Sequence, residues 1–458
     1  MSLTLLLVVM VIFAFGCSHW LAQRASRHSG PSGIEYVILG WLLGPQLEPH
    51  ILTEQYLDTL APLINLMLGL VGFIVGIRAK RLVVRADAAL AGTLLSFAIA
   101  IAVGLVVLVV QYRFGLHGSD ANWVVNWPIY EVNGWLLELR ATAGQLWLAL
   151  ALGAAACVCG ASVVERHVQV FSGSLRTRRF LTSVSSTSEL LSLSILGLTL
   201  AAARSETGAT QLGMGVTEWV VAAVGLGVLC GALFTLLIGR QRQPMRMFLT
   251  GVGVVTFASG IGAAIGVSPL FVNLLLGLTV SSISPHADEL IDEVARLRQP
   301  VNVLVLVFAG ALWTPVQGWQ WCFPLVYVVV RYGVLRLVTP MVARHTLEAP
   351  LYTRRIGHAL IGQGGVAVAV AVGVALRFPK VAPVALTTVL ASTLVGDVWS
   401  DEAVRGVLLD ADDQGQDSAP DESSADHDLD AQWAAETAGS SRMGESASDP
   451  EQINAAIA

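Results

Sequence analysis

The stretch FLTSVSSTSELLSLSILGLTLAAA, residues 180–203, places one carboxylate, Glu189, in a segment that is otherwise apolar, small or hydroxylic. The segment is long enough to cross the hydrocarbon core of a bilayer. An ionisable side chain at membrane depth is costly, and it usually marks a transport path, a proton relay or a ligand site. Glu189 is therefore the first candidate functional residue.

Hydroxyl side chains share a helical face with Glu189. Thr182, Ser185, Ser186 and Ser192 recur at helical spacing from it, and the opposite face is Leu, Ile and Val. Two interpretations stay open at this point. A row of hydroxyls is typical of a packing seam between membrane helices, whereas the carboxylate is better explained by a polar ligand inside the membrane.

The composition is that of an integral membrane protein. Of the 458 residues, 54% are hydrophobic and 13% are charged, and the mean hydropathy is +0.67. Soluble domains are about 25% charged. We predict an all-α membrane protein with about thirteen transmembrane helices. The apolar windows are 2–22, 33–47, 58–77, 88–111, 144–164, 180–203, 216–238, 246–265, 268–284, 301–317, 322–341, 356–376 and 381–399.

Basic residues alternate between connections and so predict the orientation. The positive-inside rule assigns the basic connections to the cytoplasm. These contain Arg24 and Arg27, Arg78 to Arg85, Arg166 and Arg176 to Arg179, Arg240 to Arg246, Arg296 and Arg298, and Arg344 to Arg355. The N-terminus is then outside and the C-terminus inside, which requires an odd number of helices. We expect this topology in the inner membrane of a bacterium.

The chain divides into a membrane domain, residues 1–400, and an acidic tail, residues 401–458. The tail holds 15 of the 33 acidic residues and 2 of the 27 basic ones, with Trp433 as its one aromatic residue. Such a segment cannot bury enough apolar surface to fold alone, so we expect it to be disordered. The five cysteines show no metal-ligand spacing. We expect no metal, no cofactor, no nucleic acid and no enzymatic activity.

Two windows contain glycines that can interrupt a helix. Gly160 and Ala161 lie in the window 144–164, and Gly362, Gln363, Gly364 and Gly365 lie in the window 356–376. Paired glycine interruptions in two halves of a chain indicate the site of an inverted-repeat transporter. For the first window alone, close helix packing is the simpler explanation, and for the second we favour a break.

Arg331 is the second charge predicted at membrane depth. A central arginine needs a partner, and Glu189 is the best candidate within the membrane. The alternative is that Arg331 extends to the cytoplasmic edge of the bilayer.

The order of several motifs resembles that of monovalent cation:proton antiporters, in particular their Kef-like and sodium-proton exchanger branch. The motifs are Gly40-x-x-x-Gly44-Pro45, the helix Leu70–Ile77, the segment Gly266–Leu278 and the run Gly362–Gly365. The resemblance implies two inverted repeats, a dimerisation domain and a mobile core with two crossed, broken helices. It also implies a homodimer that exchanges Na⁺ or K⁺ for H⁺.

The resemblance places the essential acid of the family on Ser188-Glu189 and the first helix break near Ala161-Ser162-Val163. The chain departs from the family at several positions. The key acid is Glu rather than Asp, Val366-Ala367 replaces a Glu-Phe pair, and the segment 308–313 has no Lys. One carboxylate therefore remains where many relatives have two charged groups.

The leading hypothesis is a secondary antiporter in which Glu189 binds either a proton or a cation. Ser162, Ser185 and Ser188 would supply further oxygens, which suit hard cations, and Arg331 would balance the charge of the empty site. One alternative is a membrane scaffold or sensor that keeps the fold without transport. Another is uptake of an organic anion with Na⁺, which requires a second positive group near the breaks.

Overall fold

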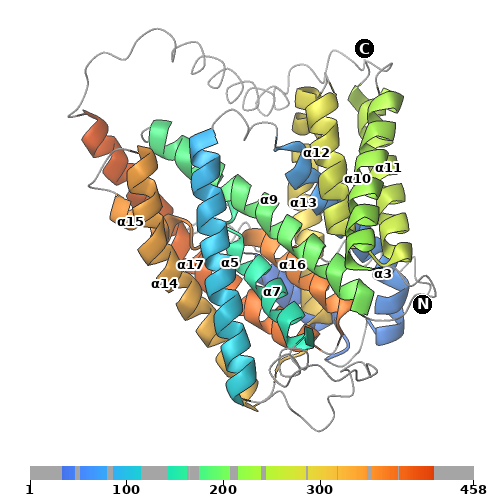
Figure 1. The fold of residues 1–458 in the computed structure, drawn as a ribbon, viewed down its shortest axis with the longest axis horizontal. Helices are drawn as coiled ribbons and strands as arrows, with labels where there is room; N and C mark the ends of the chain where they lie inside the picture. The colour runs from blue at the N-terminus through green and yellow to red at the C-terminus, as the bar shows by residue number, and fades with distance from the viewer. Residues whose placement is uncertain are drawn as a thin grey trace, which may run out of the picture. The chain divides into compact units, whose positions relative to one another are not determined.

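The computed structural model describes residues 33–46, 52–79, 86–114, 143–161, 164–165, 175–206, 215–238, 244–284, 287–316, 318–347, 353–379 and 381–416. Every regular element within these ranges is helical (Figure 1). The α-helices are α2 (Ile34–Leu43), α3 (Glu54–Ile77), α5 (Ala86–Phe114), α7 (Ala143–Cys157), α9 (Leu175–Glu206), α10 (Val216–Ile238), α11 (Pro244–Ile265), α12 (Pro269–Ile283), α13 (Ala287–Leu312), α14 (Cys322–Leu347), α15 (Thr353–Ala359), α16 (Gly364–Arg377) and α17 (Ala382–Gln416).

Several helices are suited to cross a membrane. Within the described ranges, five are long and apolar enough: segments of α3, α5, α9, α10 and α14. Five shorter apolar helices lie in α7, α11, α12, α16 and α17. The predicted all-helical membrane fold is thus confirmed. The window 2–22 lies outside the described residues, so the count of thirteen spans stays a prediction.

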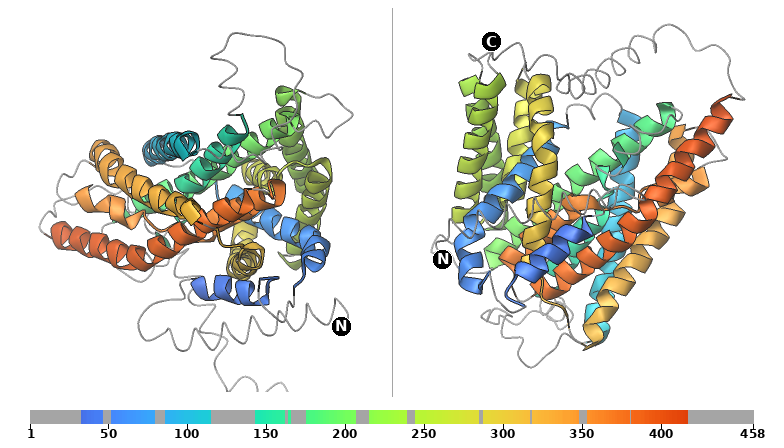
Figure 2. Two further views of the ribbon diagram at one scale, coloured as in Figure 1. Left: turned by 90° about the horizontal axis from the view of Figure 1, so that it is seen from below. Right: turned by 180° about the vertical axis from the view of Figure 1, so that it is seen from behind.

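The helices pack in two groups (Figures 1 and 2). In the first group, α3 packs against α11, α12 and α13, while α10 packs against α12 and α2 against α13. In the second group, α5, α7 and α9 pack on one another, and α14 packs on α5 and α15; α16 packs most extensively on α13 of the first group and also on α7 and α9. Helices α9 and α16 also contact the first group, and Figure 1 shows them between the two groups.

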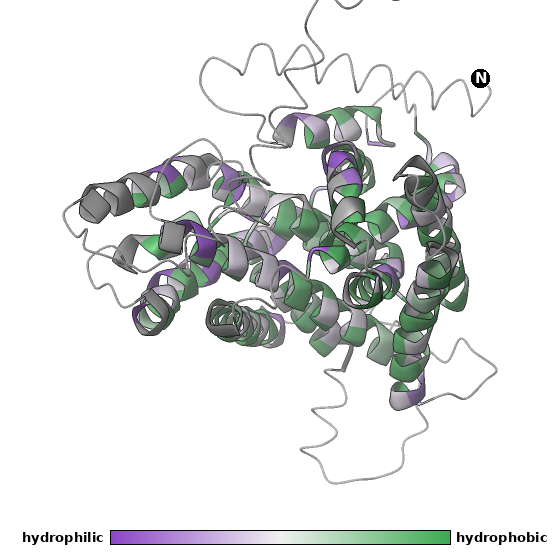
Figure 3. Cartoon of the chain, turned by 90° about the horizontal axis from the view of Figure 1, so that it is seen from above, coloured by the Kyte–Doolittle hydropathy of each residue, from purple (hydrophilic) through white to green (hydrophobic). Residues whose placement is uncertain are grey.

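The outward faces of many helices are hydrophobic, as the colouring of Figure 3 shows. Leu94, Ile101 and Leu105 on α5 are exposed, as are Leu229 on α10 and Leu337 on α14. Large apolar side chains on the outside of a helical protein with several apolar spans fit a hydrocarbon environment.

Helix α16 is buried on all sides. Its sequence alternates Gly, Ala and Val, and Gly364 to Val372 are all buried. Small residues let neighbouring helices approach a central helix closely. At Gly365 the fit is so close that a Cβ would overlap the side-chain amide of Asn302 on α13. This fit holds the start of α16 against the first group.

Two predicted boundaries differ from the structure. Helix α13 begins at Ala287, well before the window 301–317, so Arg296 and Arg298 lie within a helix and not in a connection. Helix α17 continues to Gln416, past the predicted start of the tail at 401. In both cases, charged residues lowered the local hydropathy without ending the helix. The tail beyond 416 lies outside the described residues.

Both glycine-containing windows are interrupted. Helix α7 ends at Cys157, residues 158–160 are not helical, and the helical conformation resumes at Ala161. Helix α15 ends at Ala359, and α16 begins at Gly364 after the non-helical residues 361–363. The break predicted at Gly362–Gly365 overlaps the observed one, although Gly364 and Gly365 already belong to α16. For 144–164 alone we favoured close packing; the structure shows a break there together with close packing, since a Cβ at Gly160 would lie 3.0 Å from the backbone of Gln363.

Gly364 has a positive φ of 64° at the start of α16, where an L-residue is strained by about 1–2 kcal/mol. We predict that Gly364→Ala lowers thermal stability by about that amount. The matched control is Gly333→Ala in α14, where a Cβ would meet open space and alanine is favoured by up to about 1 kcal/mol. The melting temperature in detergent should fall for Gly364→Ala and not for Gly333→Ala. Equal falls would contradict the strain assigned to position 364.

Candidate functional site

The two helix breaks cross and bond to each other. The backbone N–H of Gly160 donates to the carbonyl of Gly362 at 2.7 Å. The side-chain Nε2 of Gln363 donates to the carbonyl of Ala155 at 3.0 Å and to the Tyr327 hydroxyl at 3.1 Å. Irregular backbone at membrane depth is tolerated where protein encloses it, and residues 158–164 and 360–366 that the structure describes are buried.

Arg331 binds the helix ends at both breaks. Its Nε donates to the carbonyl of Ala156 at 2.9 Å, and its Nη2 donates to the carbonyls of Val158 at 2.8 Å and Leu360 at 3.3 Å. Its Nη1 donates to the carbonyl of Ile361. The last carbonyls of a helix have no partner within the helix and carry partial negative charge. The guanidinium of Arg331 satisfies such carbonyls at the ends of α7 and α15.

The predicted pairing of Arg331 with Glu189 is therefore corrected. Arg331 is only 2% exposed, so it does not extend to the membrane edge either. Its guanidinium donates hydrogen bonds to four backbone carbonyls. The sequence indicated that Arg331 needs negatively charged partners. The partners are the partial negative charges at two helix ends, which a search among acidic residues does not find.

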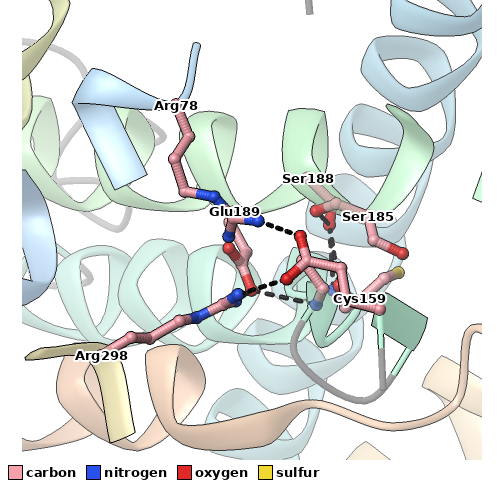
Figure 4. Close-up of polar contacts among 8 residues, drawn as sticks. Arg78, Cys159, Ser185, Ser188, Glu189 and Arg298 are labelled. Carbon is pink, nitrogen blue, oxygen red and sulfur yellow. Dashed lines mark hydrogen bonds and ion pairs between the residues drawn. The ribbon is translucent and has the colours of Figure 1, made fainter. Parts of the chain in front are cut away.

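Glu189 lies on α9 against the first break. The side chain is almost completely buried, and its Oε1 accepts the backbone N–H of Ala161 at 3.0 Å. This N–H is free for Glu189 because helical conformation only resumes at Ala161. The charged partner is Arg298 of α13, whose Nη2 lies 3.7 Å from the same oxygen (Figure 4).

The hydroxyl face of α9 bonds the backbone around the break. Ser188 Oγ accepts the N–H of Cys159 at 3.0 Å and donates to the carbonyl of Ser185 at 2.7 Å. Ser192 Oγ donates to the carbonyl of Ala154 at 2.6 Å. The two interpretations of this face thus both have support: the serines at 188 and 192 form a packing seam, while Glu189 faces a polar cluster.

Two buried oxygens at the crossing lack a hydrogen-bond partner among the described residues. They are Ser185 Oγ and Gln363 Oε1, both on fully buried side chains. A buried polar atom of this kind has hydrogen-bonding capacity to offer to a water molecule or an ion. Ser185 lies one turn before Glu189, as predicted. The predicted Ser162 lies outside the described residues.

A second carboxylate, Glu165, lies beside Glu189 and was not recognised from the sequence. Its Oε1 accepts a hydrogen bond from Arg78, at the end of α3, and its Oε2 accepts one from Arg298 at 2.5 Å. Figure 4 shows Arg78 and Arg298 reaching the cluster from two sides. Two carboxylates and two guanidinium groups therefore form one ion-pair cluster.

The side chains of this cluster differ in their access to solvent. Arg78, Glu165 and Arg298 are 21–25% exposed, whereas the Glu189 side chain is 3% exposed. A cavity of about 20 Å³ lies next to Arg298, Asn302 and Gly365. This volume is sufficient for one water molecule. Among the described residues, no group of three or more His, Cys, Asp and Glu could hold a metal ion.

No family model and no curated relative matches the chain. The structure is similar to the sodium proton antiporter MjNhaP1 from Methanocaldococcus jannaschii at pH 8, with a TM-score of 0.61 and 14% identity over 90% of this chain and 99% of that one.

A second structure of the same antiporter, from electron microscopy, gives the same result. It matches with a TM-score of 0.52 and 16% identity over 92% of this chain and 100% of that one. The chain therefore has the fold of that sodium proton antiporter. The predicted resemblance is confirmed at the level of the fold.

We predict that Arg331→Lys destabilises the protein by about 2–3 kcal/mol. Lysine keeps the charge but lacks the fork of donors that reaches carbonyls of two helix ends. The matched control is Arg336→Lys on the same helix, where the side chain is exposed and the change should stay within about 0.5 kcal/mol. Thermal melting of both variants in detergent tests this, and equal melting temperatures would contradict the assigned role.

Proposed function

We propose that this protein exchanges a monovalent cation, Na⁺ or K⁺, for protons across the membrane at Glu189. The observation that carries the proposal is the burial of this carboxylate at the crossing of two broken helices, with a guanidinium 3.7 Å away. A fold similar to that of a sodium proton antiporter supports it. The homodimer, the orientation and the choice between Na⁺ and K⁺ are parts of the same proposal.

Competition for one carboxylate couples the two ions. Desolvation favours the neutral form of a buried carboxyl, so the group binds a proton or needs a nearby cation. A Na⁺ or K⁺ ion would take oxygens from Glu189, Ser185 and the backbone of the break, since hard cations prefer oxygen ligands. Alternating exposure of a site that holds one of the two ions at a time gives exchange.

Arg298 takes the role that the sequence assigned to Arg331. The guanidinium of Arg298 compensates the charge of ionised Glu189 without a hydrogen bond, because 3.7 Å exceeds the usual donor–acceptor distance. A proton or cation on Glu189 would make this compensation unnecessary. The weak contact favours release of Glu189 to an incoming ion.

The cluster also bears on the anion-uptake hypothesis, which required a second positive group near the breaks. Arg78 and Arg298 are such groups. Both, however, are paired with Glu165, and Arg298 also with Glu189. Two positive and two negative side chains leave no net positive charge to bind an anion, so the cation hypothesis is favoured.

A transport-inactive scaffold or sensor is the remaining alternative. The same neutral cluster would then serve only to join the helix groups, and no ion would move. A measurement of cation-dependent proton exchange distinguishes the two functions.

We predict that Glu189→Gln abolishes exchange while leaving expression and insertion intact, because Gln keeps the shape and removes the titratable charge. The assay is Na⁺- or K⁺-dependent dissipation of a pH gradient in inside-out vesicles. The matched control is Glu218→Gln, an exposed carboxylate near the start of α10, which should exchange at the wild-type rate. Wild-type exchange by the Glu189→Gln variant, or no exchange by the wild type, would reject the antiporter mechanism.

A further inference from the structure

The ion-pair cluster joins the two groups of helices. Glu165 follows the break after α7, and Glu189 lies on α9, so both carboxylates belong to the second group. Arg78 ends α3 and Arg298 lies on α13, so both guanidinium groups belong to the first group. Every ion pair of the cluster therefore spans the boundary between the groups.

Arg298 is shared unequally between the two carboxylates. Its Nη1 is hydrogen-bonded to Glu165 Oε2 at 2.5 Å, while its Nη2 is 3.7 Å from Glu189 Oε1. Charge-assisted N–H···O bonds are about 2.7–2.9 Å long, so Glu165 has the bond and Glu189 has only a longer-range attraction. The guanidinium is held on the side of the more exposed acid.

Glu165 is itself fixed from the other side. Arg78 bonds its Oε1, so each carboxylate oxygen has its own guanidinium. The side chain cannot turn towards Glu189 without losing one of these bonds. Glu165 is thus a firm anchor for Arg298, and Arg78 in turn holds the anchor.

We propose that Glu165 is a positioning residue that keeps Arg298 from closing on Glu189 and thereby sets the affinity of Glu189 for protons and cations. This inference rests on the proposed ion exchange at Glu189. With glutamine at position 165 the anchoring charge is lost, and Glu189 is the remaining ion-pair partner of Arg298 among the described residues. The guanidinium would then compete directly with the transported ions.

The size of the effect follows from Coulomb's law. The contact between Arg298 and Glu189 would shorten from 3.7 Å to about 2.8 Å. At an effective dielectric constant of about 20, this strengthens the attraction by an energy that corresponds to about tenfold in an equilibrium constant. Glu165→Gln should therefore raise the cation concentration for half-maximal exchange about tenfold. A tighter guanidinium pair also favours the ionised carboxylate, so the pH dependence of exchange should move to lower pH by about one unit.

The experiment compares two double variants with the same net charge. Both contain Glu165→Gln; one adds Arg78→Gln and the other adds Arg298→Gln. The double variant with Arg78→Gln keeps Arg298 near Glu189, so its cation affinity should stay about tenfold below that of the wild type. The second removes the competitor and should return towards the wild-type cation affinity. Half-saturation and pH profile are measured with purified protein in liposomes, alongside the maximal rate.

A purely structural role of Glu165 gives a different result. Loss of folded protein would lower the maximal rate of Glu165→Gln without changing half-saturation or the pH profile, and this outcome overturns the inference. Equal half-saturation in the two double variants also overturns it, since net charge alone would then explain the effect. Thermal stabilisation of each purified variant by NaCl or KCl gives the same affinities independently of transport.

Failure of the proposed function has its own signature. A wild type that neither exchanges ions nor is stabilised by NaCl or KCl rejects the exchange and this inference together. A wild type that exchanges ions, beside a Glu165→Gln variant with unchanged affinity and pH profile, rejects only the role of Glu165.

Discussion

The binding of both helix ends by one guanidinium, Arg331, is the interaction on which the rest of the site depends. Two helices stop inside the protein, and their last carbonyls would otherwise lie unpaired in a buried environment, where each costs free energy. Arg331 bonds Ala156 and Val158 on one side of the crossing and Leu360 and Ile361 on the other. Since a buried arginine is itself costly when alone, the charge and the helix ends stabilise each other.

The same crossing provides the polar contacts of Glu189. A continuous helix would use the N–H groups of residues 159 and 161 for its own hydrogen bonds. Because α7 stops at Cys157, these groups instead donate to Ser188 and Glu189 on α9. The hydroxyl and carboxylate side chains of α9 are thus positioned by the break, and Arg298 from the other helix group completes the charge balance.

The sequence predicted the features that depend on local patterns. Glycines at 362–365 indicated a break, and the helical spacing of Thr182, Ser185, Ser186 and Ser192 from Glu189 indicated a polar helix face. The partners that were missed depend on distant contacts: Arg78 and Glu165 are 87 positions apart, and Glu165 and Arg298 are 133 apart. The positive-inside rule assigned Arg78 and Arg298 to connections, because it counts charges near helix ends without regard to which way they point.

The central claim is that a proton and a cation compete for Glu189. The most direct test is the release of protons when NaCl or KCl is added to purified protein in weakly buffered detergent solution, followed with a pH indicator over a range of pH. The account predicts release of up to about one proton per chain, because a single carboxyl titrates, with the release falling as pH rises and absent in Glu189→Gln. Cation binding without proton release at any pH, or equal release from Glu189→Gln, would contradict it.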